Sequence, residues 1–200
     1  MSRGAPSVLI VPGLRDHSAE HWQTLLAAKL AKTRNVRTVP LLGRKHLSCG
    51  ERVRLIQFEL EAIDGPVILV AHSGGAIMLA HWAQWYERAH IAGALLAAPA
   101  DLETPMPDGY PAVETLRMQG WLPIPRSRLP FPSIVAASTN DPLASLPRVE
   151  QLAHDWGSAC VHVGAVGHLN PASGFGEWPE AEALIAQLDP PGSVQPPRQG

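Results

Sequence analysis

Apolar residues follow two alternating patterns along the chain. Short continuous apolar runs are separated by longer segments in which apolar residues recur every three or four positions. The short runs predict six strands, near residues 8–11, 36–40, 66–71, 92–98, 133–138 and 159–163. The periodic segments predict helices near residues 18–32, 51–63, 74–88, 144–156 and 179–188. Ser18 is the expected N-cap of the first of these helices.

The order of these elements predicts the fold class. The third run, Val67-Ile68-Leu69-Val70, is apolar at successive positions, which is typical of a parallel strand buried on both faces. Strands that alternate with helices predict an α/β fold, with helices on both faces of a mostly parallel six-stranded sheet. Because crossovers in such sheets are right-handed, we predict the strand order 2-1-3-4-5-6.

Residues 99–132 interrupt the alternation. Eight prolines fall in this stretch, which predicts an ordered covering segment with a short helix near 113–118. Tyr110 and Trp121, with Met106 and Met118, are candidates to line a substrate pocket. The equally weighted alternative is that they pack the segment onto the body of the protein.

Length and charge exclude some function classes. The 200 residues fit a single domain, expected over 1–188, followed by a Pro-, Gly- and Gln-rich tail over 189–200 that we expect to be disordered. The net charge of −2 gives no indication of a nucleic-acid or membrane partner. The first seven residues lack the apolar segment of a signal peptide, so we expect a cytoplasmic protein.

The chain contains only two cysteines. Cys160 falls in an alternating apolar run and is expected to be buried, whereas Cys49 is expected in a loop. A disulfide between them is left open by the sequence, although so few cysteines give no indication of a disulfide-stabilised secreted scaffold. No set of histidines, cysteines and carboxylates has metal-ligand spacing, so no metal site is expected.

Ser73 is the candidate nucleophile. The sequence Ala71-His72-Ser73-Gly74-Gly75 follows a predicted buried strand and opens a predicted helix, which is the context of the nucleophile elbow of α/β-hydrolases. Small residues on either side of the serine let the neighbouring backbone approach, although Ala71 stands where the motif has glycine. The alternative is that Ser73 is only the N-cap of the helix.

His168 and Asp141 are the candidate base and acid. In this fold the acid and then the histidine follow the serine along the chain, at the ends of later strands. His168 follows the sixth predicted strand, and Asp141 follows the fifth, held in its loop by Pro142. We expect the carboxylate to orient the imidazole and the imidazole to deprotonate Ser73. Asp101, after the fourth strand, is the rival acid.

Backbone N–H groups are expected to stabilise the negative charge of an acyl-transfer transition state. Gly74 follows the nucleophile at a helix N-terminus, and Leu14 lies in the loop after the first strand. In the strand order 2-1-3 these two loops flank the point at which open α/β sheets bind ligands. We therefore predict that the Leu14 and Gly74 N–H groups form the oxyanion hole.

Several segments together resemble the RBBP9/YdeN family of small serine hydrolases. They are Val11-Pro12-Gly13, His21-Trp22-Gln23, Ala71–Gly75, Ala98–Asp101, Ser138–Pro142 and the stretch from Gly167 through Ser173-Gly174 to Trp178-Pro179. The resemblance implies the three-layer α/β-hydrolase fold, a triad of Ser73, Asp141 and His168, no metal or organic cofactor, and a minimal lid. It leaves the natural substrate open.

The sequence therefore predicts a serine hydrolase that cleaves a small ester, amide or thioester through an acyl-enzyme. The alternative from another class is a non-catalytic protein-interaction module on a hydrolase scaffold. Such proteins usually lose a triad member, whereas this chain keeps all three candidates. A lyase or haloperoxidase-like chemistry on the same fold is a third alternative. The acyl group, the leaving group and the oligomeric state stay open.

Overall fold

The computed structural model describes residues 5–15, 18–86 and 90–190. Within these ranges no helix is long and apolar enough to cross a membrane. Most of the tail predicted to be disordered, residues 191–200, lies outside the described residues, so that prediction stays untested.

A six-stranded parallel sheet forms the centre of the protein. Its strands lie in the order β2-β1-β3-β4-β5-β6, which confirms the predicted order. Every neighbouring pair is parallel, so all strands end at the same edge of the sheet. The strands are β1 (Ser7–Val11), β2 (Val36–Thr38), β3 (Val67–His72), β4 (Ile91–Ala97), β5 (Ser133–Ala137) and β6 (Ala159–His162).

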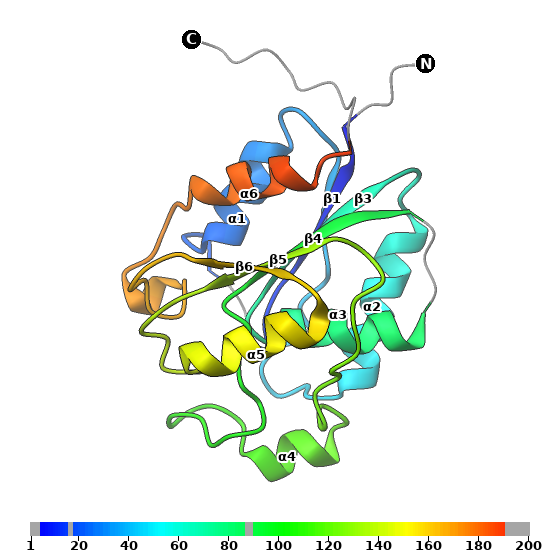
Figure 1. Ribbon diagram of the computed structural model, residues 1–200. Coiled ribbons are helices and arrows are strands. Elements are labelled where there is room, and N and C mark those ends of the chain that lie inside the picture. The colour runs from blue at the N-terminus through cyan, green and yellow to red at the C-terminus, as the bar shows by residue number, and fades with distance from the viewer. Residues whose placement is uncertain (1–4, 16–17, 87–89, 191–200) are drawn as a thin grey trace.

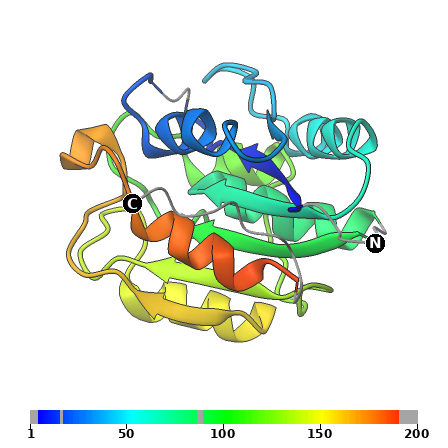
Figure 2. The same ribbon diagram turned by 90° about the horizontal axis from the view of Figure 1, so that it is seen from above.

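Helices cover both faces of the sheet, which completes the predicted three-layer fold. Figure 1 shows α1 (Trp22–Leu30) and α6 (Glu180–Leu188) together on one face. The other face is covered by α2 (Cys49–Glu61), α3 (Gly74–Trp85) and α5 (Leu146–Trp156). Seen from above, α1 and α6 lie over the strands (Figure 2).

The hydrophobic core has two parts, one on each face of the sheet. Because successive side chains of a strand point to opposite faces, Leu9 and Leu69 pack beneath α2 and α3, whereas Ile10 and Ile68 pack beneath α1 and α6. All four side chains are fully buried. Burial on both faces explains why the central strands are apolar at every position.

The proline-rich segment 99–132 is ordered and contains the predicted short helix, α4 (Val113–Met118). Arg126 joins it to α5 by pairing with Asp155 at 3.1 Å, and it also pairs with Glu103 of the same segment at 2.6 Å. Trp156 of α5 also donates a hydrogen bond to the Pro125 carbonyl at 2.8 Å. The segment is therefore fixed to the body of the protein.

Two local predictions were wrong. The first helix begins at Trp22 and is capped by His21, whose Nδ1 accepts a hydrogen bond from the Gln23 N–H at 3.2 Å, so Ser18 is not the cap. The two cysteines exchange their expected environments: Cys49 is buried at the start of α2, and Cys160 is exposed on β6. Both are free thiols. Because β6 is an edge strand, its apolar alternation does not imply burial.

The first prediction concerns the contact between α3 and β1. A Cβ atom added at Gly75 would lie 2.5 Å from the Val11 carbonyl oxygen and 2.8 Å from that of Pro12. These are backbone atoms of a buried strand end and cannot move independently. We expect Gly75→Ala to lower the free energy of unfolding by about 1–3 kcal/mol, measured by urea denaturation.

Gly176→Ala is the matched control, since a Cβ there meets nothing within 4 Å. Its unfolding free energy should stay within about 0.5 kcal/mol of wild type. Equal stability of the two variants would contradict the close approach at Gly75.

Candidate active site

Ser73 occupies a strained turn between β3 and α3. Its backbone has φ 57° and ψ −126°, a conformation that non-glycine residues rarely adopt. The turn is crowded: a Cβ on Gly13 would lie 3.1 Å from the Ser73 Cβ, and one on Gly75 would meet the Val11 carbonyl. Ala71 is fully buried without a register shift at that end of the strand, so its methyl group is accommodated. This geometry is that of a nucleophile elbow.

His168 connects Ser73 to Asp141 through both of its ring nitrogens. Nε2 lies 2.8 Å from the Ser73 Oγ, and Nδ1 lies 2.8 Å from Oδ2 and 3.0 Å from Oδ1 of Asp141. Only 4% of the histidine side chain and 1% of the aspartate side chain are exposed. The structure thus brings together three side chains from the loops after β3, β5 and β6. Because the carboxylate accepts from Nδ1–H, Nε2 is left to accept a proton from the hydroxyl.

Hydrogen bonds fix the loop that carries His168 at three points. The Asn140 Oδ1 accepts from the Gly167 N–H at 2.7 Å, and the Ser173 Oγ accepts from the His168 N–H at 3.0 Å. His72, which precedes the serine, donates from Nε2 to the His168 carbonyl at 2.8 Å. Gly167 has φ 59° and contacts Ser173 too closely for a Cβ. The imidazole is therefore oriented through its own backbone as well as through Asp141.

Asp101, the rival acid, has other partners. Its carboxylate accepts hydrogen bonds from the Glu103 N–H at 3.1 Å and the Thr104 hydroxyl at 3.1 Å, and it pairs with Arg148 at 3.3 Å. These contacts stabilise the start of segment 99–132. No hydrogen bond joins Asp101 to His168 among the described residues.

Leu14 and Gly74 lie against each other beside Ser73. A Cβ on Gly74 would lie 2.9 Å from the Leu14 Cγ. Gly74 is the first residue of α3, so its N–H has no acceptor within the helix, and the positive end of the helix dipole lies there. The Leu14 N–H donates to no residue that the structure describes. The predicted oxyanion donors are therefore adjacent to the serine.

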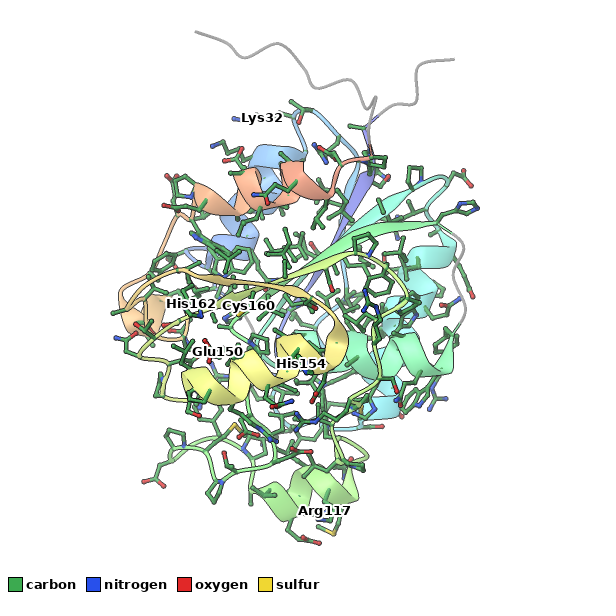
Figure 3. The ribbon with its side chains drawn as sticks, viewed as in Figure 1. Lys32, Arg117, Glu150, His154, Cys160 and His162 are labelled. Carbon is green, nitrogen blue, oxygen red and sulfur yellow. The ribbon has the colours of Figure 1, made fainter. Side chains whose placement is uncertain are left out.

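Neither cysteine offers an alternative nucleophile. Burial raises the pKa of the Cys49 thiol to about 12, so the reactive thiolate is scarce at neutral pH. Partial burial and the Glu150 carboxylate also raise the pKa of Cys160. Cys160 lies with Glu150 and His162 on α5 and β6 (Figure 3), where His162 pairs with Glu150 at 2.9 Å. No group of three or more potential ligands able to hold a metal ion occurs in the described part of the chain.

A cavity of about 240 Å³ opens beside Ser73 and His168. Tyr110 lines it, as the sequence predicts, together with Met106 from the same segment. Trp121 does not: it is fully buried, and its Nε1 donates to the Leu47 carbonyl at 2.7 Å. Because this indole joins segment 99–132 to the residues before α2, it cannot reach a substrate. The prediction of Trp121 as a pocket residue was therefore wrong.

Several residues around the site were not predicted. Only the structure shows that Asn140 and Ser173 accept hydrogen bonds from the His168 loop. It also shows a role for Gln23 in joining two strands. The Gln23 amide donates to the Val11 carbonyl at 3.2 Å and the Val70 carbonyl at 3.1 Å, joining β1 to β3 below the serine. All three residues lie in the segments that carry the family resemblance, which was the available signal.

Known proteins resemble this chain in sequence and in fold. The sequence matches the model of the serine hydrolase family over residues 8–187. Among curated proteins, none matches the sequence. A YdeN-like hydrolase from Pectobacterium atrosepticum is 30% identical and superposes with a TM-score of 0.75, with 92% of each chain covered.

Two more distant structures share the fold. The ydeN gene product of B. subtilis is 18% identical with a TM-score of 0.70, covering 92% of this chain and 98% of its own. Est1E from Butyrivibrio proteoclasticus is 13% identical with a TM-score of 0.68, covering 92% and 88%. At these identities the likeness extends to the fold alone.

The second prediction tests how the His168 loop is held. Asn140→Ala removes the acceptor of the Gly167 N–H. Since such a bond contributes about 1 kcal/mol, amide hydrogen exchange at Gly167 should accelerate about fivefold. NMR-detected exchange measures this directly.

Thr139→Ala is the control, because Thr139 is exposed in the same loop and its side chain makes no hydrogen bond among the described residues. The exchange rate of the Gly167 amide in Thr139→Ala should match the rate in wild type. An unchanged rate in Asn140→Ala would show that the loop is held by other contacts.

Proposed function

This chain belongs to the serine hydrolase family, and we propose that it is an esterase-like enzyme with Ser73, His168 and Asp141 as its catalytic triad. In this proposal the enzyme cleaves a small ester, amide or thioester through an acyl-enzyme intermediate. The observation that supports it most strongly is the hydrogen-bonded chain from the Ser73 hydroxyl through both nitrogens of His168 to Asp141. That order of groups is what acyl transfer by serine requires.

The first half-reaction acylates Ser73. The Oγ attacks the substrate carbonyl carbon while His168 Nε2 takes the hydroxyl proton, and the carbonyl π electrons move onto oxygen. The imidazolium then gives that proton to the leaving group as the carbon–heteroatom bond breaks. Asp141 holds Nδ1–H throughout and stabilises the positive charge on the ring.

The second half-reaction releases the acyl group. Water takes the position of the leaving group, His168 accepts one of its protons, and the hydroxide adds to the acyl carbon. Collapse of this second tetrahedral intermediate returns the proton to Ser73 and frees the carboxylic acid. The same base therefore serves both halves, as microscopic reversibility demands.

Leu14 and Gly74 are the proposed oxyanion donors in both halves. Gly74 follows Ser73 directly, and Leu14 lines the cavity beside Ser73, where negative charge develops on the former carbonyl oxygen. Backbone donors are fixed before the reaction begins, so they need no reorganisation in the transition state. The strained backbone of Ser73 contributes to this arrangement by directing its Oγ out of the turn.

The cavity supports a small substrate. Its volume of about 240 Å³ is below the range typical of drug-sized ligand sites. Segment 99–132 contributes Met106 and Tyr110 to one wall, so we propose that Tyr110 contacts the substrate. The segment covers the site without forming a separate domain, in keeping with the minimal lid that the family resemblance implies.

The third prediction separates the triad from its rival acid. We expect Ser73→Ala to lower kcat on p-nitrophenyl butyrate by at least about 10³-fold, since no other nucleophile is placed to replace it. Asp141→Asn should lower kcat by about 10²–10⁴-fold, because an amide no longer stabilises the required tautomer of His168. Steady-state kinetics on the folded variants gives both values.

Asp101→Asn is the matched control, the same chemical change at the other candidate carboxylate. It should keep the wild-type kcat, although it weakens the pairing with Arg148. Loss of activity in Asp101→Asn with retention in Asp141→Asn would reverse the assignment. Complete inertness of the wild-type protein on short and long acyl esters and aminoacyl amides would favour the interaction-module alternative.

A further inference from the structure

Two arginines lie at the cavity beside Ser73. Arg15 and Arg44 both line it, and none of the lining residues that the structure describes is Asp or Glu. The whole chain, by contrast, carries a net charge of −2. Of the Lys, Arg, Asp and Glu side chains that the structure describes, only positive ones line this cavity, and a cleft lined by one sign of charge attracts the opposite sign.

Arg15 is oriented for this role before any substrate arrives. Its guanidinium carbon lies 3.9 Å from the centroid of the Tyr110 ring, and its Nη2 donates to the Gly109 carbonyl at 2.6 Å. Stacking and one hydrogen bond fix the plane of the group but use few of its five N–H donors. The residue follows Leu14 directly, so its Cα is about 3.8 Å from that of the proposed oxyanion donor.

Arg44 approaches the cavity from a different part of the chain. It is exposed in the turn before α2 and forms no hydrogen bond or ion pair with any residue that the structure describes. Its charge is therefore not neutralised by the described part of the protein. Two guanidinium groups from separate loops suit a planar anionic group better than a neutral one.

The rest of the wall is partly polar, with Gln23, His72 and Asn170 among its residues, and partly apolar. Leu14, Leu102, Met106 and Leu143 line the cavity together with the arginines. This combination favours a substrate with a short apolar portion next to the reacting carbonyl and a negative charge farther away. It does not favour an aminoacyl substrate, since a protonated amine would meet two cations and no described carboxylate.

We propose that the natural substrate carries an anionic group, in the simplest case a carboxylate, which Arg15 and Arg44 bind. This inference rests on the proposed function and specifies the substrate class of the same site. The anion belongs either to the acyl group, as in the half-ester of a dicarboxylic acid, or to the leaving group. Both cases share the same recognition chemistry.

The test compares matched anionic and neutral esters with the full chain. For the acyl side, p-nitrophenyl monoadipate is compared with p-nitrophenyl hexanoate. For the leaving-group side, 3-carboxyphenyl butyrate is compared with 3-carbamoylphenyl butyrate. In one of the two pairs we expect kcat/KM to favour the anionic ester by about tenfold at low salt, and the preference to shrink as ionic strength rises.

Arg15→Gln and Arg44→Gln test the residues separately, and we expect each to reduce that preference and the double variant to abolish it. Arg15→Gln could disturb the neighbouring oxyanion donor Leu14. Arg44→Gln cannot do so in this way, because Arg44 lies in another loop. Arg117→Gln is the matched control: Arg117 lies on α4 (Figure 3), is not among the residues that line the cavity, pairs with Glu114, and should leave the preference unchanged.

The inference is overturned if wild type shows no anionic preference in either pair, or if the double variant keeps the wild-type preference. Such a failure is distinguishable from failure of the proposed function. Neutral esters would then still be cleaved by wild type and not by Ser73→Ala. If wild type cleaved these esters no faster than Ser73→Ala does, the triad itself would be rejected.

Discussion

The hydrogen bond between the Ser73 hydroxyl and His168 Nε2 constrains how the loops at this edge of the sheet run. The two residues follow β3 and β6, which are three strand positions apart, or about 14 Å across the sheet. The loop after β6 must therefore return across the ends of β5 and β4. Gly164 and Gly167, both at positive φ, permit that path, and contacts from Asn140, Ser173 and His72 hold its end.

The same requirement explains the strain at Ser73. On a relaxed strand-to-helix turn the serine Oγ would be less accessible. The φ of 57° at Ser73 directs its Oγ toward the histidine. Such a conformation costs on the order of 1–3 kcal/mol and persists only where its surroundings fix it. Here the buried strands β1, β3 and β4 and the close packing of Gly13 and Gly75 supply that support.

Periodicity predicted the fold well because each central strand is buried on both faces and helices such as α5 bury one side. It failed at Cys160, since an edge strand can be apolar and still exposed. The positions of Ser73, Asp141 and His168 after β3, β5 and β6 were predictable from the order of these residues along the chain. The burial of Trp121 could not be predicted, because this residue is held by a hydrogen bond to Leu47, 74 residues away in sequence. The arginines beside the cavity likewise became visible only when the loops were folded together.

Mapping a covalent adduct tests the central claim most directly. Diethyl p-nitrophenyl phosphate transfers a phosphoryl group to a serine only where a base activates its hydroxyl. We predict one adduct per chain, located by peptide mass spectrometry on Ser73, formed slowly in Asp141→Asn and absent in Ser73→Ala. An adduct on another residue, or equal uptake by wild type and Ser73→Ala, would contradict the account.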